Sequence, residues 1–313
     1  MRTCIIVNPG AGSVEDLGTL EARLGELPDA VVRRTEAAGD AERLAREAVR
    51  DGADLVVAAG GDGTLNEVVN GLADDFGKAR LGLLPLGTGN DFARSIGIPD
   101  DLAGALTVLE AGAARAVDVG RATVGGTCRC FINMSAGGFS GEVSERASEA
   151  KERWGPLAYM RAAIDALPEL KGFLTRIIVN GAEILEMETT NIVVCNGRYV
   201  ASGIPAAPQA VLDDGLFDVL ITPAITIPQL AGLVPQVLLG MHMNSDLLLF
   251  RRATRVEIEC DPPMGFNVDG ELIGEGIARF EILPRALQVI AGPAVGEGVF
   301  SAGTDTVAGA LSG

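Results

Sequence analysis

The chain has 313 residues, of which 48% are hydrophobic and 21% charged, and its formal net charge at pH 7 is −17. This length suits two domains with sizeable cores. The acidic charge argues against nucleic acid as a partner and against docking to an anionic membrane by charge attraction alone. Because no apolar run could span a bilayer and the first strand follows Met1 closely, we expect no secretory signal and a cytoplasmic protein. The five scattered cysteines predict buried, reduced thiols.

Strand and helix patterns alternate along the first part of the chain. We expect strands at Thr3–Val7 and Ala30–Arg34, a turn at residues 8–13 and a helix at Ala41–Arg50. The alternation continues to residues 114–120 and predicts a doubly wound, mostly parallel α/β sheet in a first domain spanning residues 1–120. Asp118 lies in an otherwise apolar strand, so we expect it to be paired or functional.

A glycine-rich turn follows the most apolar of these strands. Leu55–Ala59 is a continuous apolar run, typical of a strand buried on both faces, and Gly60-Gly61-Asp62-Gly63 ends it. We expect Thr64 to cap a helix that extends to Leu72. Strand, glycine turn and helix N-terminus together favour phosphate binding, and a carboxylate beside phosphates suggests a bridging cation. If it serves metal and phosphate, we expect Asp62 in an exposed loop at the strand end. The alternative is a tight strand-to-helix turn with Asp62 as a capping residue.

A second glycine turn follows the next predicted strand, Leu81–Leu84. Residues 85–90 read Pro-Leu-Gly-Thr-Gly-Asn, and helices are expected at Asp91–Ile96 and Leu102–Ala111. Neither turn matches the Walker A loop or the Gly-x-Gly-x-x-Gly dinucleotide fingerprint. Because both turns follow neighbouring parallel strands, we expect them to face one crevice at the carboxyl ends of the strands, where ligands bind in such folds.

From residue 121 the pattern changes to short strands with frequent turns, which predicts an antiparallel β-sandwich at residues 121–283. We expect a strand at Cys128–Ser135, a turn at Gly137–Phe139, a helix at residues 141–170 and a second helix at Ile227–Leu239. The remaining predicted strands are Thr175–Val179, Glu183–Glu188, Thr190–Cys195, Gly215–Leu220, Thr254–Glu259, Gly265–Val268 and Ala278–Leu283. The chain then returns to the first domain at about 284–300. The Gly/Ala-rich residues 292–313 predict a poorly ordered tail, and His242 is expected to be structural or on the surface.

The two glycine turns together identify a family resemblance. Gly-Gly-Asp-Gly-Thr-Leu-Asn-Glu (60–67) followed by Pro-Leu-Gly-Thr-Gly-Asn-Asp-Phe-Ala-Arg (85–94) closely resembles the diacylglycerol kinase catalytic family, which includes bacterial lipid kinases and sphingosine and ceramide kinases. The resemblance covers residues 3 to about 290. It implies a first domain like those of phosphofructokinase and NAD kinase, and an ATP- and Mg²⁺-dependent lipid kinase. The implied partners are ATP and a lipid reached by transient association with a membrane surface, with a homodimer as a further expectation and no nucleic acid.

The resemblance also implies roles for individual residues. Glu271 corresponds to the general base that takes the proton of the lipid hydroxyl, and Asp269 to a carboxylate nearby; both belong to an Asp-Gly-Glu element that closes over the glycine turns. Asp62 and Asp91 would help to hold catalytic Mg²⁺. The implied nucleotide-binding residues are Asn8, Pro9, Gly10, Ala11, Gly12, Thr35, Gly60, Gly61, Asp62, Gly63, Thr64, Leu65, Asn66, Glu67, Gly87, Thr88, Gly89 and Asn90.

A second metal site is implied at the Asp-Gly turn of residues 211–218. The carboxylate of Asp214 and the carbonyl oxygens of Val211 and Leu216 would hold a structural Mg²⁺, and Asp118 would lie near the metal–water network of the active site. From composition alone this segment is a turn between two strands. The nearby Ala201-Ser202-Gly203 replaces the usual glycine triplet of the family, so the shape of the lipid-side wall does not follow from the resemblance.

Two other functions are consistent with parts of the sequence. A soluble-substrate kinase of the NAD kinase type shares Gly-Gly-Asp-Gly-Thr, but residues 85–94 and the Asp269-Gly-Glu271 element disfavour it. A non-catalytic lipid- or nucleotide-binding protein would not need the full set of carboxylates. The identity of the phosphorylated lipid does not follow from the sequence.

Overall fold

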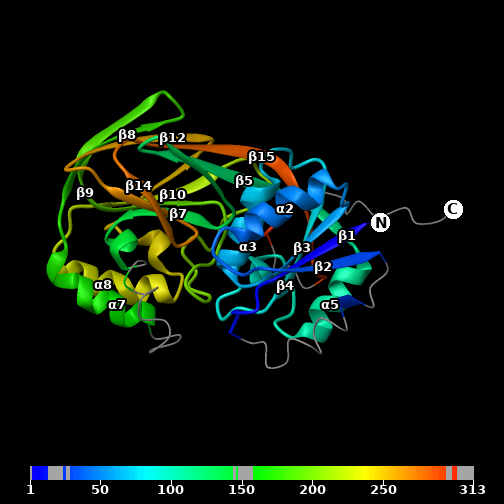
Figure 1. The fold of residues 1–313 in the computed structure, drawn as a ribbon. Coiled ribbons are helices and arrows are strands. Elements are labelled where there is room, and N and C mark those ends of the chain that lie inside the picture. The colour runs from blue at the N-terminus through cyan, green and yellow to red at the C-terminus, as the bar shows by residue number, and fades with distance from the viewer. Residues whose placement is uncertain are drawn as a thin grey trace. The chain divides into compact units, whose positions relative to one another are not determined.

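The computed structural model describes residues 2–12, 24–25, 29–143, 146, 158–293 and 298–301 (Figure 1). The chain divides into two compact units. Unit 1 comprises Met1–Asp118, Leu212–Asp214 and Pro284–Gly313, and unit 2 comprises Val119–Val211 and Gly215–Leu283. None of the described helices is both long and apolar enough to cross a membrane.

Unit 1 contains a parallel sheet with helices on both faces. Its strand order is β15-β4-β3-β1-β2, and these neighbouring strands pair in parallel. Helices α2 and α3 lie on one face and α5 on the other (Figure 1). The strands are β1 (Thr3–Val7), β2 (Ala30–Arg34), β3 (Leu55–Gly60), β4 (Arg80–Pro85) and the end of β15 (Ala278–Ile290); the helices are α2 (Asp40–Arg50), α3 (Asp62–Leu72), α4 (Asp91–Ser95) and α5 (Leu102–Ala111).

Burial explains why these segments form a sheet. β1 and β3 are buried along their whole length, as continuous apolar runs between two helix layers must be. Gly82 in β4 leaves room for the α5 side chain Leu109, whose Cδ1 would lie 2.5 Å from an added Cβ. The predicted doubly wound parallel sheet is confirmed.

Unit 2 is built from antiparallel strands. Its main sheet has the order β14-β13-β7-β9-β8-β12-β15, with β10 and β11 attached through β9, and β6 paired with β5. The strands are β5 (Ala114–Val124, which begins in unit 1), β6 (Thr127–Phe131), β7 (Met134–Gly138), β8 (Phe173–Val179), β9 (Glu183–Cys195), β10 (Phe217–Pro223), β11 (Leu249–Ala253), β12 (Arg255–Asp261), β13 (Gly265–Val268) and β14 (Glu271–Glu275). The helices are α7 (Ala158–Ala166) and α8 (Ile227–Leu238), with short 3₁₀ turns η2 (Leu167–Glu169) and η3 (His242–Asn244).

Four phenylalanines organise the core of unit 2. Phe131 stacks on Phe217 at 5.6 Å between ring centroids, and Phe280 meets both Phe131 and Phe266 edge-on. These rings come from β6, β10, β13 and β15, so they join strands that are far apart in the sequence. The predicted β-sandwich character of this part of the chain is confirmed.

Several sequence expectations for secondary structure are wrong. Gly137 lies in strand β7, because it pairs with β9 and β13, and its lack of a side chain leaves room for the ring of Phe266. The segment Cys128–Ser135 is divided between β6 and β7, and Glu183–Cys195 is one strand instead of two. Strands β11 and β14 were not predicted. Helix α3 begins at Asp62 after Gly61, so Thr64 is buried in the helix and is not its cap.

Two of the expected segments lie partly outside the described residues. Within the expected helix at 141–170, residues 144–145 and 147–157 lie outside the described residues, as do residues 302–313 of the predicted loose tail. Residues 298–301 of that tail are attached: Val299 is 2% exposed and accepts a hydrogen bond from the Leu212 amide, and Phe300 lies under the Arg115 guanidinium. A loose tail is therefore wrong for these four residues, because the segment offers an apolar side chain and a ring that pack.

The structure also tests the expectations for His242 and for the cysteines. His242 is buried, with Nε2 2.8 Å from the Ala206 carbonyl oxygen, so it is structural. All five cysteines are thiols outside any disulfide; Cys128 is exposed and Cys260 half-buried, so the expectation of buried thiols is wrong for these two positions. Burial raises the pKa of the Cys195 thiol, which keeps it protonated and unreactive.

Candidate functional site

The two glycine turns of unit 1 contact each other through their backbones. They follow the paired strands β3 and β4, whose last partners are Gly60 and Pro85, and the Leu86 amide donates to the Gly60 carbonyl oxygen at 2.9 Å. A Cβ atom on Gly87 would lie 2.5 Å from the Gly61 Cα. Glycine is therefore required at this point because any side chain would separate the turns.

Asp62 joins the second turn to the first. Its Oδ2 accepts a hydrogen bond from the Asn90 amide and its Oδ1 one from the Asp91 amide, both at 2.9 Å. These two amides belong to the start of α4, so Asp62 caps a helix that lies 28 residues further along the chain. The expectation of an exposed loop position is wrong: Asp62 is the first residue of α3 and is half-buried.

Asn90 and Asp91 fix the second turn from within. Asn90 has a left-handed backbone (φ 53°), and its side chain accepts from the Gly87 amide and donates to the Gly87 carbonyl. Asp91 is 5% exposed and forms an ion pair with Arg94 at 3.1 Å, while Arg94 also donates to the Gly89 carbonyl. The turn is thus held in one conformation by its own side chains.

The first turn of the chain joins the same edge of the sheet. Asn8 follows β1; its amide donates to the Ala59 carbonyl and its side chain donates to the Thr64 hydroxyl, both at 2.9 Å. Thr35 follows β2 and its amide donates to the Val7 carbonyl. The structure therefore brings together, at the carboxyl ends of β1 to β4, all four turns that contain the expected nucleotide-binding residues, 8–12, 35, 60–67 and 87–90.

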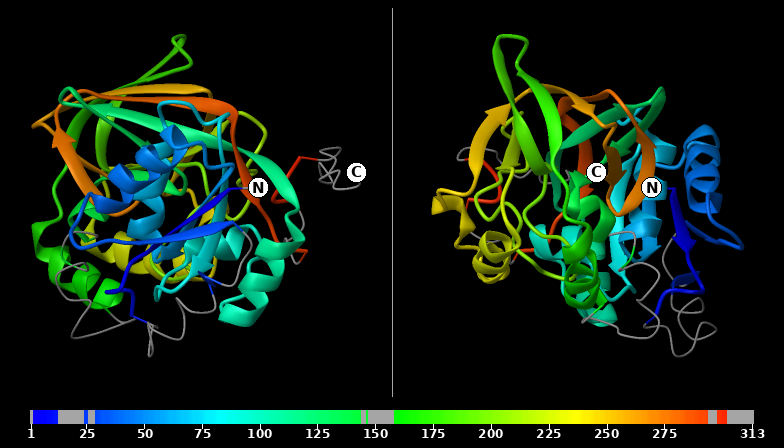
Figure 2. Two further views of the ribbon diagram at one scale, coloured as in Figure 1. Left: turned by 45° about the vertical axis from the view of Figure 1, so that its right-hand side comes forward. Right: turned by 90° about the vertical axis from the view of Figure 1, so that its left-hand side faces the viewer.

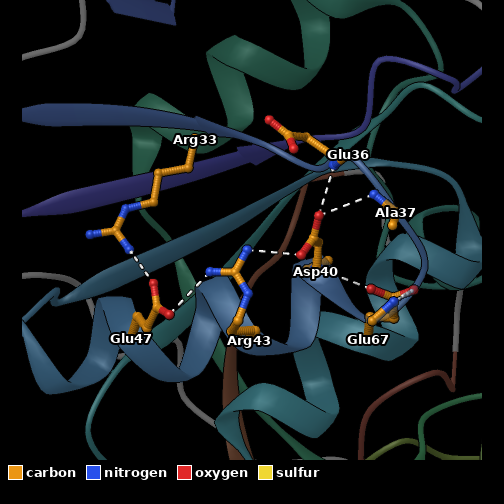
Figure 3. Close-up of polar contacts among 9 residues, drawn as sticks. Arg33, Glu36, Ala37, Asp40, Arg43, Glu47 and Glu67 are labelled. Carbon is orange, nitrogen blue, oxygen red and sulfur yellow. Dashed lines mark hydrogen bonds and ion pairs between the residues drawn. The ribbon is translucent and has the colours of Figure 1, made fainter.

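A second carboxylate of the same motif supports the turn after β2 (Figure 3). Glu67 on α3 accepts from the amides of Gly39 and Ala41, both at 2.9 Å, and so caps α2, whose own N-cap Gly39 has no side chain. Glu67, expected to contact nucleotide, is therefore engaged with backbone amides of a neighbouring helix.

Asp40 completes this support. Its carboxylate accepts from the amides of Glu36 and Ala37 and forms an ion pair with Arg43 at 2.8 Å (Figure 3). The hydrogen bond from Arg43, together with those from the two amides, lowers the pKa of Asp40 to about 2. Sequence reasoning missed this residue, although an acidic side chain in the first turn of a predicted helix was a usable signal.

Unit 2 contains the other expected catalytic residues. Asp269 has a left-handed backbone (φ 45°), and its carboxylate accepts hydrogen bonds from three consecutive amides, those of Ile132, Asn133 and Met134, at 2.9–3.0 Å. Asp269 therefore holds the turn between β6 and β7. Glu271, two residues later at the start of β14, is exposed.

Glu271 lies at a pocket within unit 2. The pocket has a volume of about 520 Å³, and its walls combine glycines, apolar side chains and a few charged groups. Among the charged groups, Lys171 and Glu142 form an ion pair at 3.0 Å. The lining residues are Gly138, Gly141, Glu142, Lys171, Phe173, Pro263, Gly265, Asn267, Gly270, Glu271, Leu272 and Glu275.

A buried acidic cluster in unit 1 involves the residues expected at the second metal site. Asp118 is fully buried and accepts a hydrogen bond of 2.6 Å from the Arg285 amide. Asp213, which sequence reasoning missed, is also buried and accepts from the amide and hydroxyl of Ser301. Its neighbour Asp214 is half-buried, in the same turn as Val211 and Leu216. Within the described part of the chain, no three His, Cys, Asp or Glu side chains come together as a metal-binding group.

The fold and the glycine turns define the class of protein. It is a two-unit α/β protein with the architecture that NAD kinases and diacylglycerol kinases share. The diacylglycerol kinase catalytic domain model matches residues 2–122, and the model of the YegS C-terminal NAD kinase beta sandwich-like domain matches residues 133–291. The chain belongs to the diacylglycerol kinase family.

Individual relatives agree with this assignment. A diacylglycerol kinase of Staphylococcus aureus is 34% identical over 93% of this chain and 92% of its own length. A crystal structure of a diacylglycerol kinase from Bacillus anthracis has a TM-score of 0.72 at 25% identity, covering 94% of this chain and 98% of that one. An NAD kinase from Archaeoglobus fulgidus, solved with ATP, has a TM-score of 0.53 at 14% identity and covers 94% of each chain, which shows a shared fold. The chain is therefore a member of a kinase family.

Proposed function

We propose that this protein is an ATP- and Mg²⁺-dependent lipid kinase that transfers the γ-phosphoryl group of ATP to the hydroxyl of diacylglycerol or a related lipid. The observation that carries the proposal is the meeting of four turns at one edge of the parallel sheet, with Gly61 and Gly87 in backbone contact. Such an edge, next to the N-terminus of α3, favours an anionic ligand.

The turns suit a triphosphate for two reasons. The first intrahelical bond of α3 runs from the Leu65 amide to the Gly61 carbonyl, so the helix directs the amides of its first turn outward. An added Cβ on Gly63 would meet no atom within 4 Å, so this glycine leaves open space above those amides. We assign phosphate binding to residues 61–64 and 87–89, and positioning of the nucleotide to residues 8–12 and Thr35.

Oxygen ligands suited to Mg²⁺ are present. The hydrogen bonds from the Asn90 and Asp91 amides take two of about four acceptor positions on the Asp62 carboxylate, which leaves capacity for a metal ion, and Asp91 supplies a second carboxylate. Asp214, with the carbonyl oxygens of Val211 and Leu216, offers the hard oxygen donors that Mg²⁺ prefers. When bound, the metal supplies neutralisation of phosphate charge.

Glu271 is the proposed general base. The lipid hydroxyl gives its proton to the Glu271 carboxylate as its oxygen attacks the γ-phosphorus; the bond from that phosphorus to the bridging oxygen breaks and ADP leaves. We assign the adjacent pocket of about 520 Å³ to the part of the lipid that carries the hydroxyl, because the exposed side chains of Pro263 and Leu272 offer apolar surface in its wall. Asp269 positions this region through the turn at residues 132–134.

The proposal is tested with purified protein, ATP labelled at the γ-phosphate, Mg²⁺ and a panel of acceptors in mixed micelles. The panel contains diacylglycerol, a sphingoid base, ceramide, phosphatidylglycerol and, as the soluble alternative, NAD. We expect label on one lipid, in an amount that falls sharply for Glu271→Gln and not for the matched change Glu259→Gln at an exposed position of strand β12, outside the pocket lining. Label on NAD alone would overturn the lipid assignment, and no label on any acceptor would favour a binding protein.

A further inference from the structure

Helix α8 of unit 2 exposes an almost entirely apolar side. Leu230 and Leu233 face the protein and are buried. The exposed residues on the opposite side are Ile227, Pro228, Ala231, Gly232, Pro235 and Leu238, followed by Leu239 at the C-cap. The exposed Gln229 is engaged in capping: its Oε1 accepts from the amide and hydroxyl of Thr226. A helix that is apolar on all sides is normally buried, so this exposure requires an explanation.

The turn after α8 extends the same surface. Leu239 is 72% exposed and Met241 64% exposed. Between and after them, the chain is anchored: Gly240 has a left-handed backbone (φ 67°) and packs against Pro205, and the buried His242 is hydrogen-bonded to the Ala206 carbonyl. The exposed apolar side chains are therefore held outward by a fixed support. We call α8 together with residues 239–241 the α8 surface.

Charge narrows the choice of partner. No Asp, Glu, Lys or Arg occurs between residues 219 and 245, although the whole chain has a net charge of −17. Repulsion between two such acidic molecules opposes a second copy as the occupant. A protein partner is disfavoured because the α8 surface lacks the Trp, Tyr and Arg anchors of protein interfaces. An anionic membrane is disfavoured because there is no basic residue.

We propose that the α8 surface docks on a bilayer of neutral or zwitterionic lipid, with the helix lying in the plane of the interface. This inference rests on the proposed function, since a lipid substrate must be reached in a membrane. Helix α8 lies at the end of unit 2 opposite the β8–β9 turn, and α7, with Ile164 56% exposed, lies at the same end (Figures 1 and 2). Burial of apolar side chains in the interface supplies the affinity, so binding is insensitive to salt.

The test measures binding of the full chain to vesicles of phosphatidylcholine by flotation at low and high salt. We expect the wild type to float with the vesicles and the double variant L238D/L239D to bind about tenfold or more weakly. The matched control is V31D/I184D, which places the same charges at exposed apolar residues of β2 and β9 (56% and 52% exposed) and should bind like the wild type. Equal binding of L238D/L239D and the wild type, or no binding of the wild type, would overturn the inference.

Phosphorylation assays separate this inference from the proposed function. On diacylglycerol in vesicles, L238D/L239D should lose activity in proportion to lost binding, whereas on a short-chain, water-soluble diacylglycerol it should match the wild type. If neither substrate is phosphorylated by the wild type while vesicle binding still depends on Leu238 and Leu239, the function fails and the docking surface stands. If ultracentrifugation shows a wild-type dimer that L238D/L239D dissociates, without vesicle binding, the surface is an interface between copies and the inference is overturned.

Discussion

The acidic residues of the two units are used in different ways. In unit 1, Asp62 and Glu67 both accept hydrogen bonds from backbone amides at the starts of neighbouring helices, α4 and α2. In unit 2, Asp269 does the same for a turn, but Glu271, two residues away, is exposed beside a pocket. A carboxylate whose oxygens accept hydrogen bonds from amides stabilises local structure, whereas the exposed carboxylate beside the pocket is the one that we propose for proton transfer. This distinction can be tested residue by residue.

The largest effect is expected for Glu271→Gln. If this carboxylate takes the substrate proton, kcat should fall by about 10²–10⁴-fold, while the ATP Kd measured by calorimetry and the unfolding free energy barely change. Asp269→Asn is the variant for comparison, because we expect loss of the Asp269 carboxylate to reduce activity by destabilising the folded protein. A nearly active Glu271→Gln together with an inactive, fully stable Asp269→Asn would reverse the roles of the two carboxylates.

Asp269→Ala should be the most destabilising of the acidic changes. Three amides, those of residues 132–134, lose their acceptor, which we expect to lower the unfolding free energy by about 2–4 kcal/mol. Urea denaturation measures this, with Glu271→Ala as the matched control on the same hairpin. A loss of under about 0.5 kcal/mol would show that the turn between β6 and β7 does not depend on Asp269.

Asp62→Asn should destabilise the protein even without nucleotide or metal. One of the two amides at the start of α4 loses its acceptor, so we expect a loss of about 1–2 kcal/mol in unfolding free energy, the usual range for a helix cap. A residue that served only to bind Mg²⁺ would leave this value unchanged in the presence of a chelator, and that result would refute the capping role.

A smaller effect is expected at the buried acidic cluster of unit 1 and its neighbour Asp214. Mg²⁺ without nucleotide should stabilise the wild type by about 1 kcal/mol at roughly five times its Kd, by mass action on the folded state. Asp214→Ala should lose this stabilisation with little change in the absence of metal, since Asp214 is half-buried. Asp213→Ala should instead lower stability at any Mg²⁺ concentration because Ser301 loses its acceptor. Equal Mg²⁺ shifts in wild type and Asp214→Ala would remove this site.

The smallest effect is a pH dependence at Asp40. Its pKa is lowered to about 2 in the folded protein, so its contribution to stability is fully present above the ordinary value of 3.8 and is lost as the pH falls toward 2. The difference in unfolding free energy between wild type and Asp40→Asn should therefore be constant from pH 7 to about 4 and shrink below. A difference that already disappears between pH 6 and 5 would contradict the observed bonds.

Much of unit 1 and the location of its site were predictable from the sequence. Apolar runs such as Leu55–Ala59 can only be buried between two helix layers, and glycine turns after adjacent parallel strands must meet at one edge. The order β15-β4-β3-β1-β2 did not follow from these local patterns, because it depends on which strands pair in the folded chain. Unit 2 was less predictable: β14 and the uninterrupted β9 depend on partners far away in the sequence.

The sequence alone determined that the chain is a two-part α/β and β protein, because apolar periodicity is a local property, and the motifs at residues 60–67 and 85–94 pointed to the diacylglycerol kinase family by their resemblance to it. Only the tertiary structure shows which backbone amides each carboxylate contacts. Asp62 meets amides 28 and 29 residues away, and Asp269 meets amides more than 130 residues away, so no local pattern could reveal these bonds. It also decided that the apolar residues of α8 face solvent instead of the core, because burial depends on which neighbours a helix finds once the chain has folded.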